Sequence, residues 1–102
     1  MNEFSQHPEV ENEIEEIVIY LEGTGLWNAD RFIERFRESL RGILQNPKSC
    51  HFVHESYRRS NLKQFPYAII YRERKDDVHV IAVMHTKRHP DYWKTRIQDD
   101  HE

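Results

Sequence analysis

The stretch YAIIYRERKDDVHVIAVM, residues 67–84, contains two β-prone runs separated by a charged turn. Residues 67–72 and 78–84 are rich in aromatic and β-branched side chains, which favour extended strands. Residues 73–77 are all polar, as is typical of a turn. Because so short a connection joins antiparallel neighbours, the stretch predicts two paired strands, with residues 78–84, the most apolar run of the chain, as a central strand.

A third strand is predicted upstream, over residues 57–65, where the sequence is polar and basic and indicates exposure on at least one face. Before it, His51 and His54 lie three residues apart in a stretch expected to be irregular or extended. In an extended chain that spacing sends the two imidazoles to opposite faces. With no second Cys/His pair at a suitable spacing, no metal site is expected.

Two amphipathic helices are predicted before these strands. The first covers about residues 8–21 and has one apolar face, formed by Val10, Ile14, Ile17, Val18 and Leu21. The second covers about residues 27–45 and ends before Pro47, because the residue that precedes a proline is disfavoured in the helical region. Gly23-Thr24-Gly25 between them is expected to supply a tight reversal, which makes the pair a helix hairpin.

The order helix, helix, strand, strand, strand predicts an α+β domain in which an N-terminal antiparallel helix hairpin packs on one face of a small antiparallel sheet of three to four strands. The length of 102 residues suits one domain, residues 1–102, with a polar tail expected to fray from about residue 97. The other face of the sheet is expected to stay partly open to solvent or to a partner.

Charge is distributed unevenly along the chain. Residues 1–40 hold ten acidic and three basic side chains, whereas residues 41–102 hold eight acidic and twelve basic ones. This asymmetry predicts an acidic and a basic face, although chance clustering on a solvated surface would look the same. No apolar run reaches the about 20 residues that a membrane helix needs. The single cysteine, Cys50, cannot form an internal disulfide, which favours a reducing cytoplasm, and the acidic N-terminus lacks the basic-then-apolar order of a signal peptide.

Four segments together resemble the RelE/ParE toxin superfamily, in particular its ParE-like or plasmid-stabilisation branch. They are an acidic first helix, a second helix that ends in ILQNP, a pair of arginines upstream of FPYAIIY, and the late run IAVMHTKRHPDYW, at residues 8–14, 43–47, 58–71 and 81–93. One departure is visible, because only residues 1–7 precede the first helix. The strand with which the family usually opens is therefore expected to be short or absent.

The resemblance implies the toxin of a type II toxin–antitoxin pair, neutralised by a cognate antitoxin and acting without a cofactor. Members of the superfamily either poison DNA gyrase or cleave messenger RNA in the ribosome. The leading hypothesis is a ParE-like toxin that binds a macromolecular target such as gyrase. The alternatives are a ribosome-dependent endoribonuclease and a non-toxic module that only binds an antitoxin; a homodimer also stays open.

Candidate residues follow from these hypotheses. RNA cleavage needs a proton acceptor, an acid and cations beside the phosphate, and the candidates for these roles are Arg58, Arg72, His85 and Arg88. Partner binding needs exposed apolar anchors, and the candidates are Tyr20, Leu26, Trp27, Tyr92 and Trp93. Each has a plainer interpretation, as a solvating charge, a histidine bonded to backbone, or an aromatic residue at the edge of the core.

Overall fold

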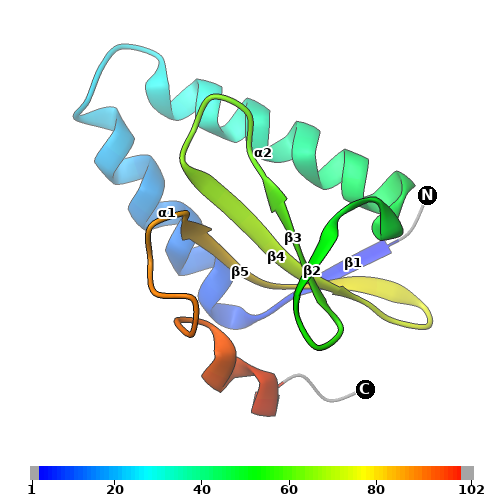
Figure 1. The fold of residues 1–102 in the computed structure, drawn as a ribbon. Coiled ribbons are helices and arrows are strands. Elements are labelled where there is room, and N and C mark those ends of the chain that lie inside the picture. Colours follow the sequence, from blue (N-terminus) through cyan, green and yellow to red (C-terminus); the bar gives the residue numbers. More distant parts are fainter. Residues whose placement is uncertain (1–2, 100–102) are drawn as a thin grey trace.

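The computed structural model describes residues 3–99 as two long helices on one face of a five-stranded sheet (Figure 1). The helices are α1, Pro8–Glu22, and α2, Asn28–Gln45. The strands are β1 (Glu3–Gln6), β2 (His51–His54), β3 (Tyr57–Asn61), β4 (Tyr67–Glu73) and β5 (Asp77–His85). Short 3-10 helices cover Pro47–Ser49 (η1) and Lys94–Asp99 (η2). The predicted α+β class and helix hairpin are confirmed.

The sheet differs from the expected one in size and in direction. Its strand order is β1-β5-β4-β3-β2, and β1 runs parallel to β5 while all other neighbours are antiparallel. The prediction of a purely antiparallel sheet with three to four strands was therefore wrong. Both edge strands, β1 (EFSQ) and β2 (HFVH), have only four residues, which are too few to show a periodic pattern.

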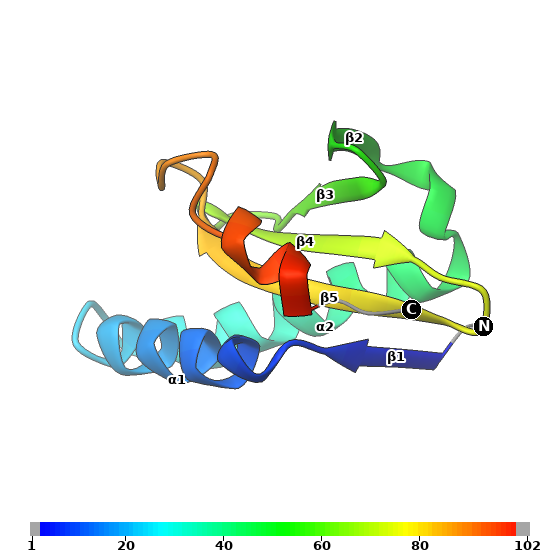
Figure 2. The same ribbon diagram turned by 90° about the horizontal axis from the view of Figure 1, so that it is seen from below.

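The helix hairpin and the sheet enclose the main core. Figure 2 shows α1 and α2 together on one side of β4 and β5. Phe32 of α2 is fully buried and its ring packs edge-on against the rings of Phe65 and Tyr67, at centroid distances of 6.0 and 5.4 Å. The apolar stripes predicted from helical periodicity therefore face the sheet, as the amphipathic pattern requires.

The second face of the sheet, which was expected to stay partly open, is covered in part by the C-terminal segment, while Val53 on this face is exposed. Trp93 is 2% exposed and packs with Tyr57, Ile81 and Met84 in a smaller apolar cluster on this face. Ile97, in η2, also packs against this cluster. Residues 97–99 of the tail that was expected to fray belong to η2, and residues 100–102 lie outside the described part of the chain.

The reversal between the helices covers residues 23–27 and begins at the predicted Gly23-Thr24-Gly25, but its left-handed residue is Trp27. Gly23 has a φ of −86°, and no glycine within residues 3–99 has a positive φ. Trp27, which precedes the first residue of α2, has a φ of 72° in the left-handed region. A bulky residue adopts that conformation only at a cost of about 1 kcal/mol or more. Its side chain is 60% exposed, so this cost is not offset by burial.

Strand β1 is held by a polar cluster at the start of β5. Ser5 Oγ donates to Asp77 Oδ2 at 2.9 Å, and Arg74 donates to both oxygens of the same carboxylate at 2.7 and 2.8 Å. The hydrogen bonds from Arg74 lower the pKa of the Asp77 carboxyl below its usual value of 3.8, although burial acts in the opposite direction. The charged form of Asp77 therefore stabilises the parallel pairing.

Replacing Asp77 by asparagine is expected to lower the free energy of unfolding by about 1–3 kcal/mol at pH 7. Because the folded pKa is the lower one, the stabilisation is present above about pH 3.8 and is lost as the pH falls through the folded pKa. Thermal unfolding of both proteins between pH 7 and pH 2.5 measures this. If the wild-type protein and the Asp77→Asn variant differed in stability by the same amount at pH 7 and pH 2.5, the stabilising role of the charged Asp77 would be contradicted.

Candidate functional site

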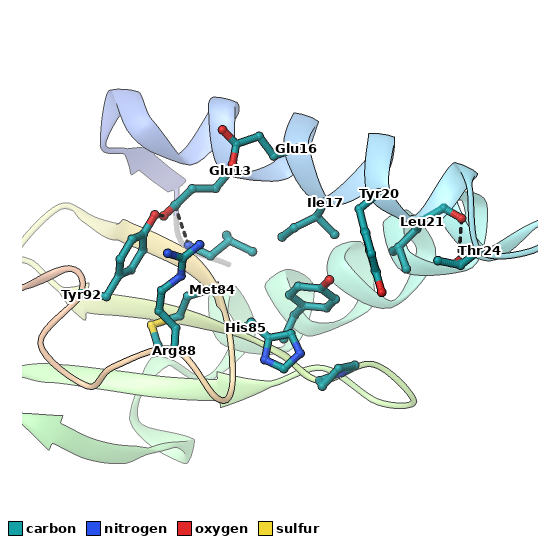
Figure 3. A pocket seen from close by; sticks show the side chains of 13 residues that line it. Glu13, Glu16, Ile17, Tyr20, Leu21, Thr24, Met84, His85, Arg88 and Tyr92 are labelled. Atoms are coloured by element: carbon teal, nitrogen blue, oxygen red, sulfur yellow. Dashed lines mark hydrogen bonds between the residues drawn. The ribbon is translucent and has the colours of Figure 1, made fainter.

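An open groove of about 550 Å³ lies between the C-terminal half of α1 and the end of β5 (Figure 3). One wall is formed by Glu13, Glu16, Tyr20 and Thr24 of α1 and the turn after it. The facing wall is formed by His85, Arg88 and Tyr92. The apolar lining between the walls comes from Ile17, Leu21, Pro66, Tyr67, Val83 and Met84.

A β-bulge in β5 decides which side chains reach the groove. Ile70 pairs with Ala82 and Tyr71 pairs with Val80, so Ile81 is an extra residue in the strand. Ile81 and Ala82 consequently both pack on the second face, and the alternation is shifted by one residue beyond them. Val83 then faces the helices and His85, two residues on, lines the groove. Without the bulge, period-two alternation would point His85 to the opposite face.

The backbone groups around the bulge are satisfied by Glu13 and Arg96. The carboxylate of Glu13 accepts a hydrogen bond from the Val83 backbone N–H at 3.0 Å through its Oε1. Its Oε2 accepts from the Tyr92 hydroxyl at 2.7 Å and from the Arg96 guanidinium at 2.9 Å. The same guanidinium donates to the Ile81 carbonyl at 3.0 Å. This buried network joins α1, β5 and the C-terminal segment behind one end of the groove.

Ionisation in the network follows from these contacts. Burial opposes the charge of Arg96, but the hydrogen bond and charge of Glu13 outweigh it, so the pKa of the guanidinium lies above its usual value. Burial raises the pKa of the Tyr92 hydroxyl, and the hydrogen bond that it donates to Glu13 raises it further. Glu13 and Arg96, with side chains 7% and 10% exposed, therefore form a buried ion pair.

Sequence analysis missed the roles of Glu13 and Arg96. A signal existed for Glu13, because it lies between Val10 and Ile17 at the spacing of the buried stripe, and a charge at such a position needs a partner inside the protein. No comparable signal exists for Arg96. Its charged partner, Glu13, lies in a helix 83 positions away in the sequence, and the carbonyl that it binds belongs to Ile81.

The structure brings together only part of the residues predicted for RNA chemistry. His85 and Arg88 line the groove, with the His85 ring 5.2 Å from that of Tyr67 and the Arg88 guanidinium 4.3 Å above that of Tyr92. On β4, Tyr67 pairs with His85, whereas Arg72 is five residues further along. At about 3.3 Å per residue these positions are roughly 16 Å apart.

Arg58 is placed even less favourably for that chemistry. It pairs with Tyr71, near the same end of the sheet as Arg72, so it is also distant from His85. Its guanidinium lies 3.8 Å above the ring of Phe52 and donates to the Cys50 carbonyl at 2.7 Å. These contacts describe an arginine that fixes strand β2.

The predicted partner-binding residues divide into three groups. Leu26 and Trp27 lie at the tip of the helix hairpin and are 78% and 60% exposed. Tyr20 and Tyr92 line the groove from opposite walls, and Tyr20 is 65% exposed. Trp93 is buried on the second face of the sheet, with its ring 5.1 Å from that of Tyr57. Within residues 3–99, no group of three or more His, Cys, Asp or Glu side chains is arranged to hold a metal ion.

The fold and the groove together define a small α+β protein with an open, apolar-lined groove on its surface. Neither helix of the described region is long and apolar enough to cross a membrane. A search of curated proteins finds no match. A similar solved structure is described as the chromosomal ParDE TA system from P. aeruginosa, with a TM-score of 0.70 and 12% sequence identity, covering 83% of this chain and 96% of that one. At this identity the similarity establishes the fold.

A family comparison identifies the protein more closely. Residues 4–90 match the family model described as ParE toxin of type II toxin-antitoxin system, parDE. The chain belongs to this family. It is a ParE-type toxin, the toxic component of a type II toxin–antitoxin system, and an antitoxin is its partner. The resemblance inferred from the sequence is confirmed.

Proposed function

We propose that this toxin inhibits growth by binding DNA gyrase and that it does not cleave RNA. The separation of the two candidate arginines from His85 carries this proposal. Arg58 and Arg72 lie near one end of β4 and His85 lies beside the other, so the four candidates do not share a cavity among residues 3–99 that could hold a base, an acid and several cations around one phosphate. A binding mechanism needs only a surface, and the exposed apolar side chains at the hairpin tip and in the groove provide one.

Induced expression in growing cells tests this function. Pulse labelling with thymidine and with methionine after induction should show an early loss of DNA synthesis, accompanied by filamentation, while protein synthesis continues. A rapid loss of protein synthesis with cleaved transcripts would support the ribonuclease. In that case His85→Ala and Arg58→Ala should each abolish cleavage. Unchanged growth would instead support a module that only binds an antitoxin.

The antitoxin is proposed to occupy the groove between α1 and β5. The groove is open, its lining is apolar, and Tyr20 reaches it from α1 with most of its side chain exposed. An amphipathic helix laid into such a groove would bury Tyr20 and the apolar lining together. Leu26 and Trp27 at the hairpin tip then extend the apolar contact beyond the groove.

Replacing Tyr20 by alanine is expected to weaken antitoxin binding by about tenfold to several hundredfold, the effect of losing an aromatic anchor. Ile19→Ala is the matched control, because Ile19 is 61% exposed on the same helix and does not line the groove. Isothermal titration with the purified antitoxin measures both affinities. Equal affinities for the two variants would place the antitoxin elsewhere.

A further inference from the structure

The charges of helix α1 are all of one sign. Every charged residue between Pro8 and Glu22 is a glutamate, and the last turn of the helix has no basic residue. Glu11, Glu15, Glu16 and Glu22 are exposed, and none of them has an ion pair or side-chain hydrogen bond within residues 3–99. The exposed side of α1 is therefore an acidic surface that the described chain does not neutralise.

This arrangement works against the stability of the isolated helix. Glu11 and Glu15 are four residues apart, a spacing at which like charges repel by a few tenths of a kcal/mol. Glu22 is the last residue of α1, where the helix dipole disfavours negative charge. A cation supplied from outside the chain would relieve both effects. Among these exposed glutamates, Glu16 lines the groove and is therefore best placed to contact a cation bound in it.

The facing wall carries the opposite charge. The segment that follows β5 has the sequence HTKRH, residues 85–89, and contains no acidic side chain. Lys87 and Arg88 are exposed, and neither forms a salt bridge within the described residues. Asp91, the nearest acid along the chain, is engaged by Lys94 at 2.6 Å. Figure 3 shows Glu16 and Tyr20 on the α1 side of the groove and His85 and Arg88 on the other.

The geometry points to an occupant with two differently charged flanks. We propose that the groove binds an amphipathic helix of the antitoxin whose apolar stripe has Lys or Arg on the flank facing α1 and Asp or Glu on the flank facing Arg88. This inference rests on the proposed placement of the antitoxin in the groove. The α1 wall extends from Glu13 to beyond Leu21, or roughly 12 Å at 1.5 Å per residue, which matches two to three turns of a bound helix.

Opposite charges on the two walls also fix the direction of the bound helix. Reversing a helix in the groove exchanges the walls that its flanks face, so each flank would then meet its own charge. A helix with two basic flanks or two acidic flanks is attracted by one wall and repelled by the other. Charge patterns of this kind discriminate between partners and orientations because juxtaposed like charges are unfavourable.

Three synthetic helical peptides test the proposal directly. They share one leucine stripe and a fluorescent label, and their flanks are Lys/Glu, Lys/Lys or Glu/Glu. Fluorescence anisotropy at low salt should show the Lys/Glu peptide binding about tenfold more tightly than either other peptide, with the difference shrinking in 0.5 M NaCl. Equal affinity of the three peptides, or tighter binding of Lys/Lys or Glu/Glu, would overturn the proposal.

Charge reversal in the protein assigns the effect to the two walls. Glu16→Lys should shift the preference to the Glu/Glu peptide, and Arg88→Glu should shift it to the Lys/Lys peptide. Glu34→Lys and Arg41→Glu make the same changes in net charge on the exposed surface of α2, away from the groove, and should leave the preference unchanged. If the control variants changed the peptide preference as much as Glu16→Lys and Arg88→Glu do, the preference could not be assigned to the two walls of the groove.

Tyr20→Ala separates this inference from the proposed location of the antitoxin. The variant should weaken all three peptides alike, because it removes an apolar contact and leaves the charges in place. Peptides insensitive to Tyr20→Ala would show that the groove is not the docking site. Peptides that need Tyr20 but do not distinguish their flanks would retain the site and refute only the charge pattern.

Discussion

Replacing Glu13 by alanine is expected to lower the free energy of unfolding by about 3–5 kcal/mol, the usual cost of removing one member of a buried ion pair. The variant leaves the Arg96 guanidinium, the Tyr92 hydroxyl and the Val83 backbone N–H without the acceptor that they share. Urea unfolding followed by circular dichroism measures the change. The decrease in the free energy of unfolding is expected to be larger than for alanine substitution of any single exposed glutamate of α1, since those side chains have no buried partners.

Glu15→Ala is the matched control for this experiment, because Glu15 is exposed on the same helix. Surface substitutions of this kind usually change stability by about 0.5 kcal/mol or less. Arg96→Met adds a second test. The double variant with Glu13→Ala should lose less free energy of unfolding than the sum of the two single variants, because Arg96→Met removes the charge that Glu13→Ala leaves unpaired. Additive losses would mean that the two side chains do not stabilise each other.

Replacing Trp93 by alanine is expected to lower the free energy of unfolding by about 3–5 kcal/mol, as is usual when a large aromatic side chain is removed from a core. Trp93 is 2% exposed and fills the space between the sheet and the C-terminal segment, so its loss leaves a cavity on the second face. Trp27→Ala removes the same side chain from a position that is 60% exposed.

Comparison of the two tryptophan variants tests whether the C-terminal segment contributes to the fold. Urea midpoints monitored by circular dichroism should fall strongly for Trp93→Ala and little for Trp27→Ala. In the Trp27→Phe background, the emission of Trp93 should shift to longer wavelength in the same transition as the loss of helix signal. Emission typical of an exposed indole in native buffer would contradict the packing of Trp93 described above.

Sequence periodicity predicted the elements that are long enough to show it. Helix α2 repeats its apolar pattern over several turns, and strand β5 is the most apolar run of the chain and rich in β-branched residues, so their type and position followed from the residues. The opening strand was expected to be short or absent and is present as the four-residue β1, whereas β2 was not predicted, because four residues carry at most two alternations. The bulge at Ile81 was not predicted either, because a single extra residue inside a run of apolar side chains leaves no gap in the pattern.

The groove could be predicted only in part for a related reason. Tyr20, His85, Arg88 and Tyr92 were each singled out as chemically useful, yet spacing in the sequence does not say that the end of α1 meets the end of β5. That meeting depends on the parallel strand β1, which pairs only with the first half of β5 and leaves the second half to the helix. The same register places Arg58 and Arg72 near the other end of the sheet.

The extra residue in β5 also constrains how related toxins can diverge. A deletion at Ile81 would restore regular alternation, turn Val83 away from the helices and leave Glu13 and Arg96 with no backbone groups to bind. Related toxins that lack the extra residue are expected to have apolar side chains in place of Glu13 and Arg96. Related toxins that keep it are expected to have both the glutamate and the arginine. We therefore expect residues 13, 81 and 96 to show correlated substitutions in an alignment of ParE sequences.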